Sequence, residues 1–248
     1  MPVKSYFLPQ SRVADFDQFR AVYILEGSLI NETPMRIGMG RTEQLGSAAD
    51  VPHIRIRRGG EEVPYIPGSS LKGAFRSLVE RVSAAIYGAD SVHPPFDFKR
   101  AEAEYLENRI CPTCGIFGST MVASHVAIRD SLPKGSAVIA QKTGIGINRD
   151  FGGVQPGAGP FVEEYVPPGV EWTFHMRVTN IALESESEDD PRPELLRFLL
   201  SSLIRGEIQV GGRASIGAGV ISLRNIRALK RTLNLEGRLV EAEVKLKL

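Results

Sequence analysis

The residues best suited to chemistry gather at the start of one expected helix, in the segment PYIPGSSLKGAFR. Its first turns carry two hydroxyls, a lysine, a glycine and an arginine: Ser69, Ser70, Lys72, Gly73 and Arg76. The first backbone N–H groups of a helix lack intrahelical partners, and the helix dipole adds partial positive charge, so an anion is favoured there. Gly73 permits close approach, and Lys72 and Arg76 share one face. The pattern predicts a cradle for a phosphate backbone; the alternative is a capped helix with solvated charges.

A second segment, GGRASIGAG (211–219), is rich in glycine. Glycines let the main chain lie against a ligand, and Arg213 adds a positive charge within the segment. The candidate ligand contacts are Gly211, Gly212, Arg213 and Ser215. The alternative is a bulged strand pair with tight turns.

The two cysteines stand in CPTC, as Cys111 and Cys114, a spacing that resembles half of a zinc knuckle. A structural zinc ion needs four ligands, and the sequence holds no second cysteine pair. His93 is the first further candidate and His125 the second. Such a site would clip an otherwise loose insertion together. The alternatives are a redox pair or two isolated thiols.

Among the acids, Asp50 is the strongest candidate for catalysis or metal binding, because it lies in the glycine-dotted loop GSAADVPHIRI. The alternative is an aspartate that forms an Asx-turn. Asp130 and Asp150 are weaker candidates. His53, three residues after Asp50, is a further candidate for the same site, although a lone histidine more often has a structural role.

The elements that must position these residues begin with an apolar strand over 19–31, followed by a long polar connection over 32–64. The helix comes next, with Ser69 or Ser70 expected as N-cap and Gly88 as its end. Its apolar face recurs at helical spacing: Leu71, Phe75, Leu78, Val79, Val82 and Ile86.

Beyond the helix, residues 89–118 are expected to be irregular. The expected strands and second helix then follow in this order: a strand over 124–131, a strand that opens a glycine-rich excursion over 137–161, an alternating strand over 169–183, a helix over 193–206 and a last alternating stretch, LVEAEVKLKL. The acidic loop 184–190 is expected to be solvated. Two helices on one face of an antiparallel sheet make an α+β fold, and a ferredoxin-like βαββαβ core with large insertions fits best.

The length, composition and net charge limit the classes of protein to which the chain can belong. The chain has 248 residues, of which 42% are hydrophobic and 24% charged, as in an ordinary globular domain, and no linker or repeat divides it. The net charge of +1 means that a nucleic-acid surface must come from local clustering. Two close cysteines fit a reducing compartment. No apolar run reaches the ~18 residues of a membrane span, and the start lacks a signal peptide's apolar stretch, which predicts a cytoplasmic protein without membrane contacts.

The segments PYIPGSSLKGAFR, CPTCGIFGS, SHVAIRD and GGRASIGAG, in this order, resemble the RAMP superfamily of CRISPR-associated proteins. The likeness is to the repeated backbone subunit of type III interference complexes, of the Csm and Cmr kinds and their type III-D relatives, over about residues 20–226. It implies a modified ferredoxin-like, RRM-like palm with a lid or finger insertion and a zinc-clip-like insertion. It also implies a thumb hairpin, which KTGIGINRDFGG (142–153) resembles.

The resemblance implies function as well. Copies of such a subunit stack along a guide RNA, beside other type III subunits, and each thumb separates guide from target RNA. The implied RNA-binding residues are those named above together with Arg36, Arg41, Lys142 and Arg149. The single RAMP domain would span 1–248, with its core over 19–226 and insertions over 32–64, 89–118 and 142–168.

Asp50 matches the aspartate with which active family members cut target RNA, helped by a divalent cation such as Mg²⁺ or Mn²⁺. The implied reaction is attack of a ribose 2′-hydroxyl on the adjacent phosphate. One alternative is a scaffold subunit that binds guide RNA and does not cut. Another is a stand-alone endoribonuclease that processes precursor guide RNA, which ranks last because no histidine occupies a convincing site.

Overall fold

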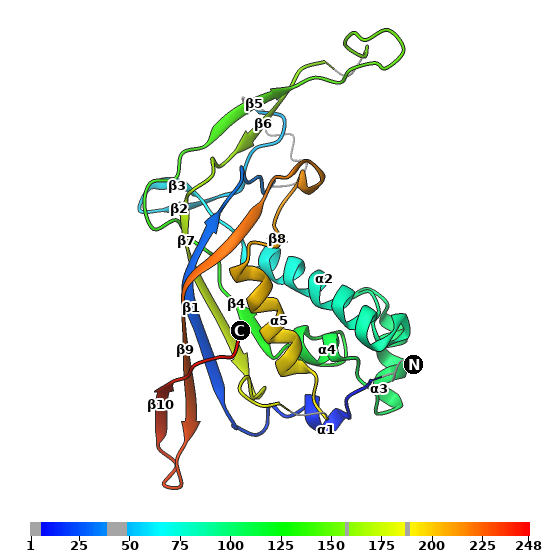
Figure 1. Cartoon of the computed structure of the whole chain (residues 1–248), viewed down its shortest axis with the longest axis vertical. Coiled ribbons are helices and arrows are strands. Elements are labelled where there is room, and N and C mark those ends of the chain that lie inside the picture. Colours follow the sequence, from blue (N-terminus) through cyan, green and yellow to red (C-terminus); the bar gives the residue numbers. More distant parts are fainter. Residues whose placement is uncertain (1–5, 39–48, 157–158, 187–188) are drawn as a thin grey trace.

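The computed structural model describes residues 6–38, 49–156, 159–186 and 189–248. The architecture is mixed α/β, built on an antiparallel sheet in the order β10-β9-β1-β7-β4, with β8 also paired to β9 (Figure 1). Its strands are β1 (Val22–Asn31), β4 (Val126–Ile128), β7 (Glu171–Thr179), β8 (Ile208–Gln209), β9 (Val220–Leu233) and β10 (Leu239–Glu243).

The strand β7 shows why this sheet has one buried face. Its predicted apolar positions alternate along the chain, and those within the strand are all buried: Trp172, Phe174, Met176 and Val178. The register places Leu25 of β1 opposite Met176 on one side and Ala228 of β9 on the other. Because side chains on a strand alternate between faces, these residues form one continuous apolar surface.

Two helices cover that surface: α2 (Gly68–Tyr87) and α5 (Arg192–Ile204) (Figure 1). The predicted apolar face of α2 is confirmed at Leu71, Phe75 and Val79, which are fully buried, whereas Ile86 at its far end is 52% exposed. The predicted extent of α5 is also confirmed, with a proline in its first turn.

The predicted N-cap at Ser69 or Ser70 is wrong. The helix begins at Gly68, preceded by Pro67, and no side chain within the segment caps it. Instead, Gly68 N–H donates to Oδ1 of Asp130, which follows β4, at 2.8 Å. A cap supplied by a residue distant in sequence satisfies the same orphan donor and also ties the helix start to the sheet.

The expectation that 89–118 is irregular is also wrong, because this insertion is largely helical. It contains η1 (Ala89–Ser91), α3 (Phe98–Leu106) and α4 (Pro112–Phe117). Asp97 caps α3 by accepting the N–H of Arg100 at 3.1 Å, and Pro112 occupies the first turn of α4. The polar composition of α3 and its short length concealed these helices in the sequence.

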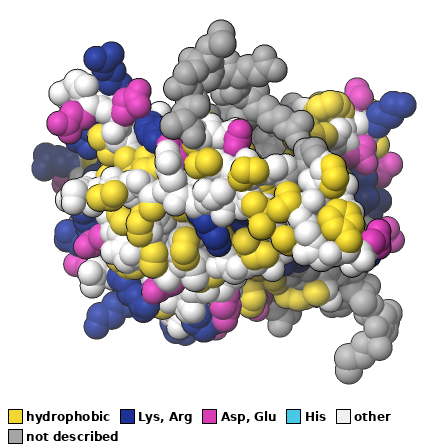
Figure 2. All heavy atoms as spheres, turned by 90° about the horizontal axis from the view of Figure 1, so that it is seen from above, with side chains coloured by type: hydrophobic (Ala, Val, Ile, Leu, Met, Phe, Trp, Pro, Cys, Tyr) yellow, Lys and Arg dark blue, Asp and Glu magenta, His cyan; other side chains and the backbone are white. Residues whose placement is uncertain are grey.

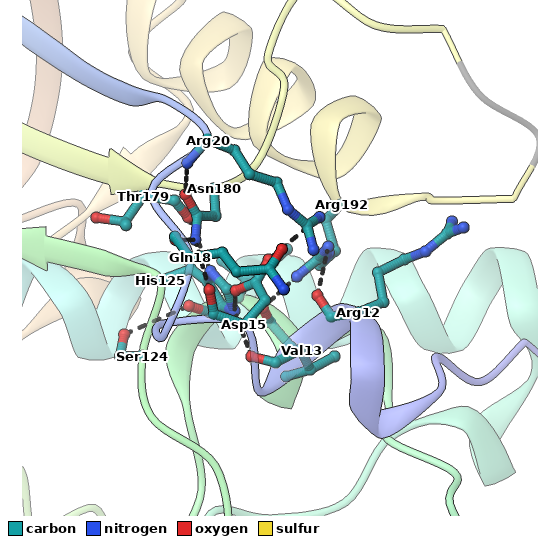
Figure 3. A network of polar contacts seen from close by, with 12 residues as sticks. Arg12, Val13, Asp15, Gln18, Arg20, Ser124, His125, Thr179, Asn180 and Arg192 are labelled. Atoms are coloured by element: carbon teal, nitrogen blue, oxygen red, sulfur yellow. Dashed lines mark hydrogen bonds and ion pairs between the residues drawn. The ribbon is translucent and has the colours of Figure 1, made fainter. Parts of the chain in front are cut away.

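The insertion packs on the N-terminal arm, which contains α1 (Gln10–Val13), through a second, smaller hydrophobic cluster that includes Leu8, Val13 and Ile110. A network of buried polar contacts fixes the arm to the sheet (Figure 3). In it, the two ring nitrogens of His125 meet the carbonyl oxygens of Val13 and Thr179 at 2.9 and 2.7 Å. The N-terminal arm therefore links the insertion to the sheet.

Two further ribbons lie outside the main sheet. The expected long connection contains the hairpin of β2 (Arg55–Arg58) and β3 (Glu61–Pro64). The glycine-rich excursion predicted over 137–161 begins with β5 (Ala140–Gly144) and leads into its partner strand β6 (Phe161–Tyr165), most of which lies beyond the predicted range. The β5–β6 hairpin projects well beyond the sheet (Figure 1). The short helix η2 (Ala214–Ile216) lies in the loop between β8 and β9. Within the described residues, no helix has the length and apolar character needed to cross a bilayer.

The two glycines of α2 provide a matched pair for testing how closely this helix approaches the sheet. A Cβ at Gly68 would stand 2.3 Å from the carbonyl oxygen of Ile128, whereas one at Gly73 meets nothing within 4 Å. We expect Gly68→Ala to lower the free energy of unfolding by about 1–3 kcal/mol, as overpacking does. Gly73→Ala should raise it by up to about 1 kcal/mol, because alanine favours the helix. Urea unfolding of both variants measures this; equal effects would contradict the packing described here.

Candidate functional site

The strand β6, at the root of the projecting hairpin, is where three of the predicted site residues converge: Asp50, Arg36 and Arg213. Asp50 donates its N–H to the carbonyl oxygen of Val162 at 3.0 Å, and its Oδ2 accepts the N–H of Val162 at 2.7 Å. This pair of hydrogen bonds fixes Asp50 on the strand while its side chain stays exposed. One oxygen of the Asp50 carboxylate is therefore used in a hydrogen bond to the backbone of β6.

The next residue on the strand, Glu163, gathers two of the predicted arginines. Its Oε1 lies 2.7 Å from Nη1 of Arg36 and 2.9 Å from Nη2 of Arg213, and its Oε2 accepts the hydroxyl of Tyr165 at 2.8 Å. Glu163 is only 5% exposed. Burial opposes its charged form, but the hydrogen bonds from Arg213 and Tyr165 and the charge of Arg36 outweigh burial and lower the pKa of Glu163.

The glycine-rich loop is locked against the first long loop at the same place. The N–H of Gly212 donates to the carbonyl oxygen of Arg36 at 2.8 Å, and a Cβ at Gly211 would stand 2.1 Å from that oxygen. Gly211 has a φ of +90°, which favours glycine. Arg213 lies over the ring of Phe161, 5.5 Å from its centroid. Glycine is thus needed here for contact between two loops of the protein itself.

The opposite side of β6 is held by a second acid. Glu164 accepts the N–H of His53 at 2.9 Å and pairs with Arg55 at 2.8 Å. His53 is fully buried; its Nδ1 lies 2.9 Å from the carbonyl oxygen of Ile54, and its Nε2 has no hydrogen-bond partner. Burial lowers the pKa of His53. This histidine is therefore a buried part of the segment that Glu164 holds against β6.

The residues at the start of α2 form a second group, on a helix that also packs against β8. Ser69 and Gly73 are exposed. Lys72 donates to Oγ of Ser124 at 2.9 Å, and burial together with the charge of Arg76 lowers the pKa of Lys72. Arg76 donates to Glu80 and to the carbonyl oxygen of Gly118, each at 2.7 Å. The guanidinium of Arg76 is thus already hydrogen-bonded within the protein. The exposed side of this helix start is the one that carries Ser69 and Gly73.

The three predicted metal ligands come together. The ligand atoms of His93, Cys111 and Cys114 all lie within 4.8 Å of one another, and all three residues are buried. His93 Nε2 is 3.3 Å from Cys114 Sγ, and Cys111 Sγ accepts the N–H of Cys114 at 3.2 Å. Glu104 places Oε2 at 3.5 Å from His93 Nε2. Three nitrogen and sulfur donors this close form a cluster that suits a soft divalent metal.

Without a metal, contacts among the same three side chains shift their pKa values strongly. Hydrogen bonds with Cys114 and Glu104 raise the pKa of His93 to about 10. Contact with Cys111 and then with His93 lowers the pKa of Cys114 to about 5, while that contact and burial raise the pKa of Cys111. A thiolate is the form of cysteine that binds metal, so Cys114 is ready to bind a metal near neutral pH.

The remaining candidates take other positions, and only Lys142 stands opposite a residue of the arginine cluster, Glu163, in the described strand register. His125 is bonded to two backbone carbonyls and is not part of the metal cluster; Asp130 caps α2. Lys142, Arg149, Asp150 and Ser215 are exposed, on the β5–β6 hairpin or in η2. Arg41 lies outside the described residues.

Comparison with known proteins agrees with the family resemblance seen in the sequence motifs. The sequence profile of the RAMP superfamily matches residues 29–222, more than half of the chain. The chain belongs to the RAMP superfamily. This RAMP protein is also 26% identical, over 242 residues, to the CRISPR system Cms endoribonuclease Csm3 of Methanothermobacter thermautotrophicus, and the alignment covers 86% of this chain and 88% of that relative.

Sequence reasoning missed the acids that hold this RAMP site together, namely Glu104, Glu163 and Glu164. The signal for the last two was present in FVEEY, where adjacent acids stand in an otherwise apolar strand. Two buried carboxylates on opposite faces of a strand require cations on both sides. Those cations come from segments far apart in the sequence, so their pairing could not be read from spacing.

The buried His53 generates a prediction about pH. The unfolded chain protonates this histidine near pH 6.5, whereas the folded protein resists protonation, so the free energy of unfolding should fall as the pH drops below about 6.5. We expect His53→Leu to flatten this dependence between pH 7.5 and 5.5 in urea unfolding. His175 is less buried and its pKa is also lowered by burial, so His175→Gln should flatten the dependence to a smaller extent. An unchanged slope in His53→Leu would contradict a neutral buried ring.

Proposed function

We propose that this protein is a backbone subunit of a type III CRISPR ribonucleoprotein, which binds guide RNA and cuts complementary target RNA with Asp50. The observation that carries the proposal is the convergence on β6, where Asp50 is fixed beside the two arginines on Glu163. The likeness to a relative named as a CRISPR endoribonuclease supports it. We propose that it acts in the cytoplasm. Its proposed protein partners are further copies of the chain, in a filament, and other type III subunits.

The strand order supports a modified ferredoxin-like palm. In chain order, the four strands that alternate with α2 and α5 are β1, β4, β7 and β9, and they stand in the sheet as β9-β1-β7-β4. That arrangement, fourth-first-third-second, is the one expected for a βαββαβ unit with both helices on one face. The β5–β6 hairpin is then the thumb, and one RAMP domain spans residues 1–248 with the insertions predicted above.

The proposed RNA path runs over two features. Arg36, Arg213 and the glycine-rich loop offer charge and backbone groups to phosphates near the thumb, and Lys142 adds a cation on β5. The start of α2 offers its serines, Lys72 and the open surface above Gly73. Base pairing between guide and target supplies sequence specificity, so the protein needs only backbone contacts.

In the proposed reaction, the ribose 2′-hydroxyl attacks the adjacent phosphorus and the bond to the 5′ oxygen breaks. The products are a 2′,3′-cyclic phosphate and a 5′-hydroxyl. In the course of the reaction the 2′ oxygen loses its proton and the departing 5′ oxygen gains one. Asp50 takes part by accepting the first proton or by helping to hold a cation, through the oxygen not bonded to Val162. Arg36 and Arg213 stabilise charge on the phosphate.

A divalent cation fits this site as an ion shared with RNA. Among the described residues, Asp50 belongs to no cluster of three or more metal-ligating side chains. Mg²⁺ is commonly held by one or two carboxylates together with substrate phosphates, and it would supply charge stabilisation to the reacting phosphate. The isolated position of Asp50 is also what favours the second candidate function, a scaffold subunit that binds RNA and does not cut.

Substitution of Asp50 separates these two functions. In an assembled complex with a known guide, we expect regularly spaced cuts in an end-labelled complementary RNA that depend on Mg²⁺ or Mn²⁺. Asp50→Asn should reduce the cutting rate at least about 100-fold with RNA binding unchanged, because it keeps an oxygen for the N–H of Val162 and loses the charge.

The control is Asp150→Asn, which removes an exposed carboxylate at the end of the same hairpin and should cut like the wild type. Tight target binding without cuts by the unmodified complex would make this chain a scaffold.

We also propose that His93, Cys111 and Cys114 hold a structural zinc ion. Ligand atoms around tetrahedral zinc stand about 3–4 Å apart, close to the spacing found here, and Glu104 offers a further oxygen donor. The ion would join α4 to the segment that precedes α3, within an insertion otherwise held by the small hydrophobic cluster. Its contribution would be to stability.

Metal analysis tests this second proposal. We expect about one zinc per chain in the purified protein, and less than about a tenth of that in Cys114→Ser. A strong chelator should lower the melting temperature of the wild type and leave Cys114→Ser unaffected. Cys111→Ser provides a repeat on the other thiol. Zinc-free protein with the full melting temperature would rule out a structural ion.

A further inference from the structure

The side chain of Arg76 joins the helix α2 to the cysteine pair, and the proposed RNA path makes no use of it. Its Nε donates to Oε1 of Glu80 at 2.7 Å, its Nη1 to the carbonyl oxygen of Gly118 at 2.7 Å, and its Nη2 to Sγ of Cys114 at 3.6 Å. The side chain is 12% exposed. The planar fork of an arginine reaches acceptors in three directions, which a lysine cannot do. All three nitrogens of Arg76 are thus used inside the protein.

Two of these acceptors lie at the end of α4, beside the metal-ligand cluster. Cys114 belongs to the cluster, and Gly118 follows the helix and donates its N–H to the carbonyl oxygen of Cys114 at 2.9 Å. Gly118 has a φ of +83°, and a Cβ there would stand 3.0 Å from the backbone nitrogen of Ser124. The chain therefore turns back tightly after α4, and the position of this turn depends on the position of Cys114.

The same turn holds Lys72, one helical turn before Arg76. Its Nζ donates to Oγ of Ser124 at 2.9 Å, and that hydroxyl lies 3.3 Å from the carbonyl oxygen of Ile116 in α4. Residues four apart share one face of a helix, so Lys72 and Arg76 present one face of α2 to the segment 114–124. The end of α4 is therefore in contact with both basic side chains of this helix start.

Lys72 is the cation that the start of α2 offers to RNA in the proposed function. The hairpin end of the molecule does not offer many centrally placed cations. Seen from that end, hydrophobic side chains gather in the middle of the face and charged ones stand mostly around its edge (Figure 2). RNA affinity should therefore be sensitive to how the start of α2 is held.

We propose that Arg76 is a positioning residue, which couples the His93–Cys111–Cys114 cluster to RNA binding at the start of α2. The inference rests on the proposed RNA-binding function and the proposed metal, and it deepens both. A metal held through Cys114 fixes the end of α4, and Arg76 and Lys72 transmit that position to the face of α2 that meets RNA. Loss of the metal therefore weakens RNA binding. Because such coupling is reciprocal, bound RNA strengthens metal binding by the same factor.

The test applies one conservative substitution at two places on α2. Arg76→Lys keeps the positive charge and loses the three-way contact. Arg81→Lys is the matched control, because Arg81 is exposed and donates to the carbonyl oxygen of Ser77 within the helix.

Binding of a labelled single-stranded RNA to the full chain is measured by fluorescence anisotropy, for zinc-loaded protein and for protein stripped with a chelator. The temperature is one at which stripped wild type keeps its circular dichroism. Equilibrium competition for zinc with a chromogenic chelator, with and without RNA, gives a reading that is independent of RNA cutting.

We expect zinc-loaded wild type to bind RNA at least about fivefold more tightly than stripped wild type, the lower end of typical coupling between sites. Arg81→Lys should show the same difference. Arg76→Lys should bind RNA equally with and without zinc, at about the affinity of stripped wild type. RNA should raise the zinc affinity of the wild type and of Arg81→Lys by the matching factor, and leave that of Arg76→Lys unchanged.

A further variant, Arg76→Gln, separates positioning from direct contact with RNA and replaces Arg76→Lys if that variant does not fold. Loss of one phosphate contact lowers the slope of log affinity against log salt by about 0.7 for a single strand. A positioning residue predicts an unchanged slope, and a fall of that size would make Arg76 an RNA ligand and overturn the proposal.

The remaining outcomes also decide. Equal RNA affinity of zinc-loaded and stripped wild type would overturn the coupling and leave the proposed RNA binding and zinc site standing. The same zinc dependence in Arg76→Lys as in the wild type would overturn the role of Arg76. A wild type that binds RNA and no zinc would overturn the coupling together with the zinc site, and one that binds no RNA would overturn the proposed function as well.

Discussion

The buried carboxylate of Glu163 is the constraint on which the arrangement of the candidate site depends. It joins an arginine from the first long loop, an arginine from the glycine-rich loop and a tyrosine of its own strand. A buried acid with two arginines is stable only while both remain paired to it. Because one negative charge meets two positive ones, the cluster keeps a net positive charge, and Arg213 remains 40% exposed in its side chain. The same contact therefore orders the loops and leaves a cation for an anion.

This arrangement explains how a chain with a net charge of +1 can suit a nucleic acid. Many of its arginines are bound to acids of the protein and contribute little to a long-range field. The positive charge available to a nucleic acid is therefore local. Among the described residues, it comes from cations without an acidic partner at the hairpin root and at the start of α2, together with backbone groups there. A guide held mainly through its backbone needs such positions at regular intervals and does not need a uniformly basic surface.

The sequence allowed the sheet and its two covering helices to be predicted, because β1, β7, α2 and α5 carry apolar residues at clear periods. It did not reveal the cap on α2, since Asp130 is 62 residues from Gly68 and only the fold brings them together. The helices of the insertion were missed because α3 is short and polar. For the site, residue types singled out Asp50, the glycine-rich loop and the cysteine pair as candidates, and their roles stay predictions. The acids that bind these segments together were missed, because a carboxylate's partners depend on tertiary contacts.

The glycines of the loop illustrate how function and packing share residues in this fold. From the sequence, Gly211 and Gly212 suggested a main chain that lies against a ligand, yet both face the carbonyl of Arg36 or its side chain. Their absence of side chains lets the loop approach Arg36 closely enough for Glu163 to reach both arginines. In the proposed function, the surface offered to RNA would be the outer side of that loop, where Ile216 and Gly217 border a cavity at the hairpin root. A residue needed for internal contact thus shapes the surface that RNA would meet.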